Sequence, residues 1–293
     1  MSASARPRRS VLYMPGSNAR ALEKGRGLPA DGLILDLEDA VAPDAKEIAR
    51  RQIVEALQQG GYGKREIVVR VNALDSAWGK DDVKAIATSG ADAILLPKVE
   101  TAAMIHALEK LMDAAGAPTS MGIQCMMETP LGMLNAKEVA GASPRITCLV
   151  MGTSDLVKDL QAAHTPQRLP VLTSLGLCIL AARAHGIAIT DGVHLDLSDD
   201  EGFAAQCRQG KELGFDGKTL IHPKTIAKAN EVFAPSGEEI EWSHKIIAAH
   251  AQASAEGQGV VVVDGKLVEN LHVESAKRLV ALSNAIKELE SAA

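Results

Sequence analysis

Two carboxylates follow short apolar runs of the 293-residue chain and are the first candidates for chemistry. Glu128 directly follows the run at 121–127, and Asp155 comes soon after the run at 147–151. If these runs are neighbouring strands, the two carboxylates meet at one edge and suit Mg²⁺ or Mn²⁺, whose remaining positions are filled by water and substrate oxygens. No grouping of His and Cys competes for a softer metal. The alternative is that each carboxylate caps a helix or pairs with a base such as Lys98.

Arg70 lies at the end of another apolar run, at 67–71. Its planar guanidinium offers a fork of donors that matches a carboxylate or an enolate oxygen. Its alternative partners are the carboxylates of Asp36, Glu38 and Asp39. The two roles are compatible, because one carboxylate can orient the guanidinium while a substrate takes its remaining donors. We therefore treat Arg70, Glu38 and Asp39 as candidate catalytic residues.

The loop at 15–20 has the composition of an anion site or of an ordinary helix cap. Pro15 and Gly16 precede a helix that opens with small residues, which leaves backbone N–H groups free to meet an anion. Arg20 and Lys24 would add positive charge. Near the other end of the apolar runs, His222 either contacts a ligand or packs within its own loop.

Eight apolar runs are expected to form the strands that position these side chains. They are near-continuous rather than alternating, as strands buried on both faces of a parallel sheet require. Helical periodicity fills the intervals between them, for example at 44–59, 101–115 and 199–213. Since no dinucleotide-type glycine loop follows the first run, the pattern favours a closed (β/α)8 TIM barrel over an open doubly wound sheet. The predicted strands are 11–14, 33–37, 67–71, 93–96, 121–127, 147–151, 187–190 and 218–221.

The barrel accounts for residues 1–234, and residues 235–293 are predicted to be a C-terminal extension. Within the extension, the valine-rich stretch at 260–268 surrounds Asp264-Gly265 and predicts a β-hairpin, because Asp-Gly is a preferred two-residue turn. A helix precedes the hairpin and a final helix at about 272–291 follows it. The ionisable residues at the carboxyl ends of the barrel strands would converge over one mouth, where barrel enzymes place their chemistry.

The composition limits the class of protein. The formal charge is −6 and 46% of the residues are apolar, which is typical of a globular protein and argues against nucleic acid as a partner. No apolar run approaches the roughly 20 residues that span a bilayer, so we expect no membrane partner and a cytoplasmic location. The four cysteines are isolated in apolar surroundings and are expected to be reduced core thiols.

Seven motifs in order carry a resemblance to a known family. The chain resembles the citrate lyase β-subunit-like branch of the HpcH/HpaI aldolase superfamily, which includes malyl-CoA and citramalyl-CoA lyases. The motifs are RSVLYMPGS from Arg9, LDLEDAV from Leu35, VRVN from Val69, LLPKVE from Leu95, METPLG from Met127, MGTSDL from Met151 and GKTLIHP from Gly217.

The resemblance implies a Mg²⁺-dependent barrel that acts on malyl-CoA-type thioesters, with coenzyme A as part of the substrate. It implies that Glu128 and Asp155 bind the metal and that Arg70 holds the thioester or enolate oxygen. The expected reaction is a reversible Claisen-type cleavage to an acyl-CoA and a 2-oxoacid. The expected substrate-binding and CoA-binding residues are Tyr13, Pro15, Gly16, Arg20, Lys24, Glu128, Gly152, Thr153, Ser154, Asp155, Ile221, His222 and Pro223.

Glu269 departs from the pattern of the lyases that the chain resembles. In those enzymes an aspartate of the hairpin region, contributed across a subunit interface, moves the proton of the thioester α-carbon. Here Glu269 takes that place, and a carboxylate misplaced by about one ångström can cost on the order of 10²-fold in rate. This variant resembles the (3S)-malyl-CoA thioesterase members, in which water attacks the thioester, so hydrolysis to malate and CoA is the alternative activity.

A lesser alternative is a β-like subunit of a carrier-dependent citrate-lyase complex. The extension has few places to bury its valines on a closed barrel, so a homo-oligomer is expected. By resemblance it is a trimer or a dimer of trimers, in which the extension covers a neighbouring subunit's active site.

Overall fold

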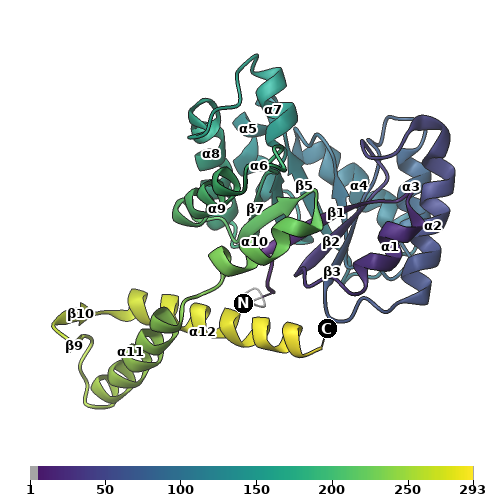
Figure 1. The fold of residues 1–293 in the computed structure, drawn as a ribbon. Helices are drawn as coiled ribbons and strands as arrows, with labels where there is room; N and C mark the ends of the chain where they lie inside the picture. The colour runs from purple at the N-terminus through teal and green to yellow at the C-terminus, as the bar shows by residue number, and fades with distance from the viewer. Residues whose placement is uncertain (1–5, 293) are drawn as a thin grey trace. The chain divides into compact units, whose positions relative to one another are not determined.

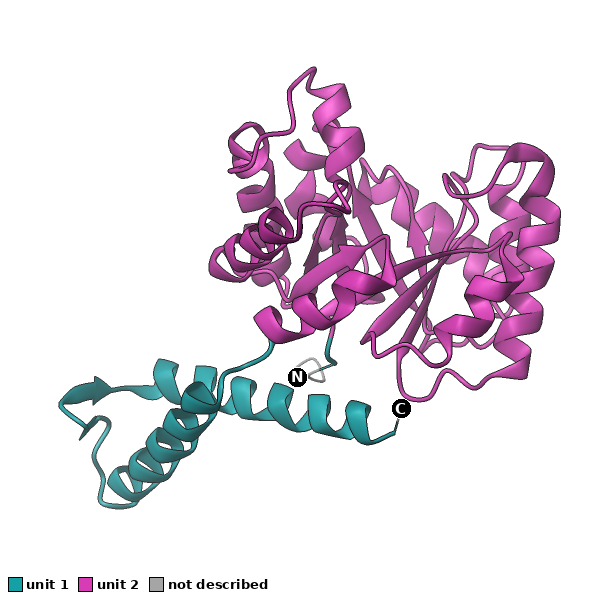
Figure 2. Cartoon of the chain, viewed as in Figure 1, with its two compact units in different colours: residues 1–7, 234–292 teal, residues 8–233, 293 magenta. Residues whose placement is uncertain are grey.

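The computed structural model describes residues 6–292 and divides them into two compact units (Figure 2). The larger unit contains residues 8–233. The smaller unit contains residues 234–292 together with residues 6 and 7. No helix of the described residues is both long and apolar enough to cross a membrane.

The larger unit is a closed barrel of eight parallel strands in sequential order, β1 to β8 (Figure 1). Each predicted apolar run forms one of these strands, so the predicted (β/α)8 barrel is confirmed. The strands are β1 (Ser10–Pro15), β2 (Gly32–Asp36), β3 (Glu66–Arg70), β4 (Ala93–Leu96), β5 (Gly122–Met127), β6 (Ile146–Met151), β7 (Ala188–Asp191) and β8 (Gly217–Leu220).

Helices alternate with the strands and cover the outside of the barrel (Figure 1). The predicted helix at 44–59 begins as a 3₁₀ turn at Pro43–Ala45 and becomes α-helical at Lys46. The helices are α1 (Ala19–Gly25), α2 (Lys46–Gln59), α3 (Gly79–Ile86), α4 (Ala102–Ala114), α5 (Pro130–Leu134), α6 (Ala136–Ala140), α7 (Thr153–Asp159), α8 (Leu172–Ala184), α9 (Asp200–Leu213) and α10 (Ile226–Phe233).

Two apolar layers explain why the strand sequences are nearly continuous in hydrophobicity. An inner cluster that includes Val11, Ile34, Val68 and Val150 fills the barrel. A larger outer cluster packs the opposite strand faces against the helices. Because both faces of every strand are buried, alternation with polar residues is lost except near the strand ends. The four cysteines are free and buried, as expected.

The smaller unit packs two helices and a hairpin around its own apolar cluster. It contains α11 (Gly237–Ala255), the antiparallel pair β9 (Val261–Val263) and β10 (Lys266–Val268), and α12 (Asn270–Ser291). The predicted hairpin is present, with Asp264 and Gly265 both at positive φ in its turn. The final helix begins at Asn270, two residues earlier than the predicted start. Its core includes Val263, Val268 and Val273.

Closure of the barrel depends on close backbone contact at Gly217, the first residue of β8. A Cβ added there would lie 1.8 Å from the carbonyl oxygen of Arg8. We expect Gly217→Ala to lower the free energy of unfolding by about 2 kcal/mol or more, measured by chemical denaturation. The matched control is Gly176→Ala in α8, where an added Cβ meets nothing within 4 Å, and it should be neutral or stabilising by up to about 1 kcal/mol. Equal stability of the two variants would contradict this account of closure.

Candidate active site

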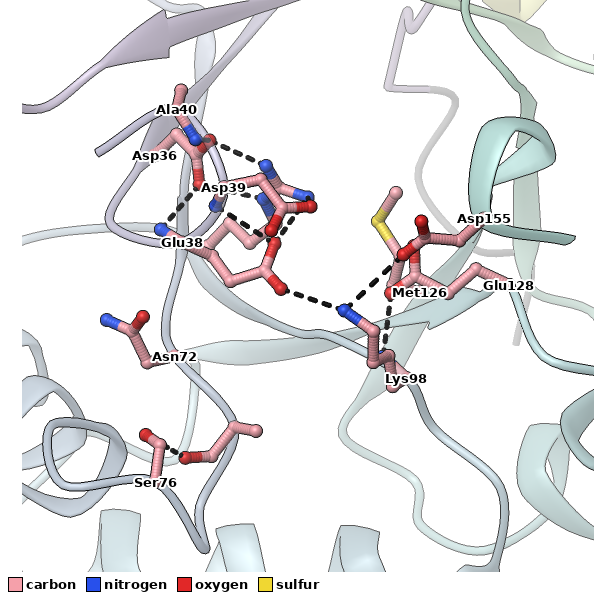
Figure 3. Close-up of polar contacts among 12 residues, drawn as sticks. Asp36, Glu38, Asp39, Ala40, Asn72, Ser76, Lys98, Met126, Glu128 and Asp155 are labelled. Atoms are coloured by element: carbon pink, nitrogen blue, oxygen red, sulfur yellow. Dashed lines mark hydrogen bonds and ion pairs between the residues drawn. The ribbon is translucent and has the colours of Figure 1, made fainter. Parts of the chain in front are cut away.

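The carboxyl ends of β2 to β6 bring the candidate residues to one mouth of the barrel. Asp36 is the last residue of β2 and Arg70 is the last residue of β3, and the strand register pairs them directly. Lys98 follows β4, Glu128 follows β5, and Asp155 lies in the first turn of α7 after β6. Figure 3 shows the Lys98 side chain between Glu38 on one side and Asp155 on the other.

Asp36 fixes the guanidinium of Arg70 through two parallel hydrogen bonds. Arg70 Nε and Nη2 donate to the two Asp36 oxygens at 2.7 and 2.6 Å, and the Asp36 side chain is fully buried. The guanidinium also lies 5.0 Å from the centre of the Tyr13 ring, within range of a cation–π interaction. The Tyr13 hydroxyl donates to Met126 Sδ at 3.3 Å, which holds the ring in place. Arg70 is therefore preorganised before any ligand arrives.

Glu38 connects this guanidinium to a second cation. Its Oε2 lies 2.8 Å from Arg70 Nη1, and its Oε1 lies 3.1 Å from Lys98 Nζ. The backbone of Glu38 is held in turn by buried Lys46, whose ammonium donates to the carbonyl oxygens of Leu37 and Glu38, both at 2.8 Å. Burial raises the pKa of Glu38, although Arg70 opposes this shift.

Glu128 and Asp155 both contact Lys98, so the two proposed metal ligands lie at the same place in the mouth. The backbone N–H of Lys98 donates to Glu128 Oε1 at 2.9 Å. Lys98 Nζ lies 3.4 Å from Asp155 Oδ2. Glu128 is buried and packs directly on Gly152, where an added Cβ would come within 2.4 Å of Glu128 Oε2. Gly152 is thus a position at which any side chain would displace this carboxylate.

The donor set fits a hard divalent cation that keeps several non-protein ligands. The described residues contain no cluster of three or more His, Cys, Asp or Glu side chains that could hold a metal alone. A pair of carboxylates is what Mg²⁺ uses when water and substrate oxygens complete its octahedron. Burial raises the pKa of Glu128 to about 7, even though the Lys98 backbone hydrogen bond opposes the shift. The charges of Lys98 and Arg70 also lower the pKa of this carboxyl, but they offset the effect of burial only in part.

Other predicted catalytic and substrate-binding residues also lie around the mouth, and they range from buried to exposed. Asp39 is exposed and reaches only to 3.9 Å from Arg70 Nη1. Thr153 is buried and Ser154 is half-buried at the start of α7. Gly16 donates its N–H to the carbonyl oxygen of Asp36 at 2.9 Å, which ties the loop that follows Pro15 to β2.

The predicted CoA-binding side chains of α1 and of the loop after β8 are exposed. Arg20 and Lys24 lie on α1, whose start is capped by Asn18, as the alternative interpretation of this loop holds. His222 accepts a hydrogen bond from the Lys224 backbone at 3.1 Å and so orders its own loop, beside exposed Ile221 and Pro223. A role for these residues in binding CoA stays a prediction.

Glu269 belongs to the smaller unit. It is exposed and immediately precedes α12. Its backbone N–H donates to His272 Nδ1 at 3.0 Å, so the start of the helix fixes its main chain. Its proposed catalytic role stays a prediction.

One strand end that is polar in sequence serves the structure of the barrel. Asp191, the last residue of β7, is fully buried and bonds to Arg168 Nη1 at 2.7 Å and to Lys218 Nζ at 3.0 Å. Burial by itself would raise the pKa of Asp191, but these two cations hold it below its ordinary value. This carboxylate is fully compensated, whereas Glu128 is not.

Two residues of the site were considered in sequence only as alternative ionic partners. Asp36 orients Arg70, and Lys98 joins the two groups of carboxylates. Both lie where a predicted strand ends, which is the signal that identified their neighbours. Their importance follows from strand register and from a positive φ of 49° at Lys98, neither of which composition or spacing indicates.

Comparison with known proteins finds a family model and relatives that cover most of the chain. A sequence model of the HpcH/HpaI aldolase/citrate lyase family matches residues 9–223. The chain is 52% identical over 286 residues to a (3S)-malyl-CoA thioesterase of Cereibacter sphaeroides, with 98% of each protein covered. It is 38% identical over 277 residues to citrate lyase subunit beta of Escherichia coli, with 93% of this chain and 92% of that one covered.

A solved structure is similar over nearly the whole chain. The protein CitE of Mycobacterium tuberculosis, in complex with magnesium, acetoacetate and coenzyme A, matches with a TM-score of 0.74 and 27% identity. The match covers 96% of this chain and 100% of that one.

The raised pKa of Glu128 predicts how stability depends on pH in the presence of a chelator. Relative to an ordinary value of 4.5, the folded protein keeps this proton up to a pH of about 7. The protonated Glu128 side chain therefore contributes its full stabilisation below pH 4.5, and this stabilisation is lost as the pH rises through about 7. We expect the unfolding free energy of the unmodified protein to fall by about 3 kcal/mol relative to Glu128→Gln across this range, measured by urea denaturation. A difference that stays constant with pH would contradict the assignment.

Proposed function

The chain belongs to the HpcH/HpaI aldolase/citrate lyase family, and we propose that it is a Mg²⁺-dependent thioesterase that hydrolyses a malyl-CoA-type thioester to a free acid and CoA. The predicted family is thereby confirmed. The observation that carries the proposal is the 52% identity to a (3S)-malyl-CoA thioesterase over 98% of both proteins. The arrangement of Arg70, Glu128 and Asp155 at one barrel mouth supports it, because this chemistry needs positive charge beside a thioester oxygen.

In the proposed mechanism Glu128 and Asp155 would hold the magnesium ion. When bound, the ion supplies Lewis-acid polarisation of substrate oxygens. Arg70 faces the thioester carbonyl oxygen with donors that Asp36 and the Tyr13 ring have already oriented. The negative charge that develops on this oxygen meets a fixed cation, so little reorganisation is required as the charge forms.

Hydrolysis also needs a group that takes a proton from water. We assign this role to Glu269, contributed by a neighbouring subunit of a homotrimer or of a dimer of trimers. The water oxygen bonds to the thioester carbon, the carbon–sulfur bond breaks, and the proton passes through the carboxylate to the departing thiolate. The assignment is supported by the position of Glu269, whose side chain is longer than the aspartate that the lyases this chain resembles carry at the same place. A cytoplasmic location stays a prediction.

Reversible carbon–carbon cleavage is the second candidate activity. The citrate lyase subunit beta that matches 93% of this chain favours it. The same residues would serve, because cleavage of a β-hydroxyacyl-CoA leaves an enolate whose charge lies on the same thioester oxygen. The two activities therefore differ in the proton acceptor and in the products, while the charged residues of the barrel mouth are common to both.

Product analysis distinguishes the two activities. With malyl-CoA and Mg²⁺, we expect one equivalent of malate and one of free thiol, with no glyoxylate trapped by phenylhydrazine. EDTA, or Glu128→Ala combined with Asp155→Ala, should abolish the reaction. Glu269→Asp should shift the products toward glyoxylate and acetyl-CoA. Glyoxylate formed in step with substrate loss by the unmodified protein would replace the thioesterase with a lyase, and an unchanged product ratio in Glu269→Asp would remove the role of that side chain.

Arg70→Lys tests whether an oriented fork matters beyond a single positive charge. Lysine keeps the charge but cannot form two parallel bonds to Asp36, so the cation is no longer fixed beside the developing charge. We expect kcat to fall by about 10²-fold to 10³-fold with a smaller change in KM. The matched control is Arg145→Lys, which precedes β6 at the opposite end of the barrel and pairs with Asp113. A loss confined to KM would make Arg70 a binding residue only.

A further inference from the structure

Lys98 connects Glu38, which contacts Arg70, to the two proposed metal ligands Glu128 and Asp155. The geometry points to a role for Lys98 that goes beyond a structural ion pair. We propose that Lys98 is a built-in counter-ion that holds the metal-binding carboxylates in place and competes with the divalent cation for Asp155. The inference rests on the metal site of the proposed function. It assigns this residue control over how tightly that site binds its metal.

The backbone and the side chain of Lys98 act on different carboxylates. The N–H group fixes Glu128 Oε1 at 2.9 Å, while Nζ lies 3.4 Å from Asp155 Oδ2 (Figure 3). The residue adopts a left-handed conformation, with φ at 49°, which a residue with a side chain rarely takes. Such conformations persist where surrounding contacts determine them, and they concentrate at functional sites. Here the conformation allows one residue to reach two proposed metal ligands.

The ammonium of Lys98 has a second anion to which it can move. Nζ is closer to Glu38 Oε1, at 3.1 Å, than to Asp155. The side chain of Lys98 is 43% exposed and flexible, so its head can move without disturbing the backbone contact to Glu128. When a divalent cation occupies Asp155, Lys98 would keep Glu38 alone, and Glu38 also contacts Arg70. The ion pair with Asp155 is thus the one that metal binding replaces.

Electrostatic repulsion between the Lys98 ammonium and the metal ion determines how much the metal affinity should change. An ammonium and a divalent ion that share one carboxylate lie within several ångströms of each other. Even at the dielectric constant of water, a repulsion between charges of one and two at about 5 Å changes affinity by roughly tenfold. Removing the ammonium should therefore strengthen metal binding, although the variant loses an ion pair. A residue that only supports the site would weaken metal binding when removed.

Lys158 provides a matched control on the same carboxylate. Its Nζ lies 3.9 Å from Asp155 Oδ1, and it also pairs with Asp159 at 3.3 Å. Its side chain is 70% exposed, so solvent screens its charge far more than that of Lys98. The two lysines thus differ in their position relative to the barrel mouth and share the contact with Asp155.

The test is a titration of the substrate-free protein with Mn²⁺. The protein is first treated with EDTA to remove bound metal, and Mn²⁺ binding is then monitored by electron paramagnetic resonance. We expect Lys98→Met to bind Mn²⁺ at least tenfold more tightly than the unmodified protein. Lys98→Arg should stay within about threefold of the unmodified protein, as should Lys158→Met. Both substitutions at position 98 keep the backbone N–H that holds Glu128.

A thermal shift measurement separates competition from general damage to the fold. Without metal, Lys98→Met should melt at a lower temperature than the unmodified protein, because Glu38 and Asp155 lose the ammonium that pairs with them. When Mn²⁺ is added, the melting temperature of Lys98→Met should rise by more than that of the unmodified protein. Equal or weaker Mn²⁺ binding by Lys98→Met, with binding intact in the unmodified protein, overturns the inference about Lys98 alone. Absence of Mn²⁺ binding in every variant overturns the metal site of the proposed function.

Discussion

A chain of ion pairs runs along the barrel mouth, and the candidate site depends on it. It begins at fully buried Asp36, passes through Arg70, Glu38 and Lys98, and ends at Asp155. Each cation in this chain is shared between two or more carboxylates, so no member can move without changing the charge balance of its neighbours. Burial strengthens these interactions because the interior screens charge less than water does. The mouth is therefore rigid where Arg70 is held by Asp36 and adjustable where half-exposed Lys98 lies between two anions.

The contrast between Asp191 and Glu128 shows how partners decide the role of a carboxylate at a strand end. Asp191 is compensated by Arg168 and Lys218, and their charges keep its pKa low despite burial. Glu128 is similarly buried, but it receives a backbone N–H group from Lys98 and no guanidinium, and burial raises its pKa. A fully compensated carboxylate stabilises the barrel. An incompletely compensated one is ready to accept a cation, and strongly perturbed pKa values in a cleft are typical of functional sites.

Hydrolysis and carbon–carbon cleavage make the same demand on the barrel, which explains how one site can serve both members of a family. Each reaction places negative charge on the thioester oxygen, and in the proposed mechanism this charge meets Arg70, which Asp36 and the Tyr13 ring hold in place. The difference must then lie in the group that moves the proton. In this chain that group is proposed to be Glu269, which belongs to the smaller compact unit, so the reaction can change while the barrel mouth stays the same.

The barrel, its eight strands, the hairpin at Asp264-Gly265 and most residues of the mouth can be predicted from the order of amino acids alone. These features are local: continuous apolar runs require burial on both faces, and polar residues after such runs must lie at strand ends. Which charges pair becomes known only from the folded chain. The register that sets Asp36 beside Arg70 joins residues 34 positions apart. The reach of Lys98 to both Glu128 and Asp155 depends on the left-handed backbone of this one residue. Several carboxylates near several cations allow many pairings in a sequence, and the geometry of barrel closure selects one of them.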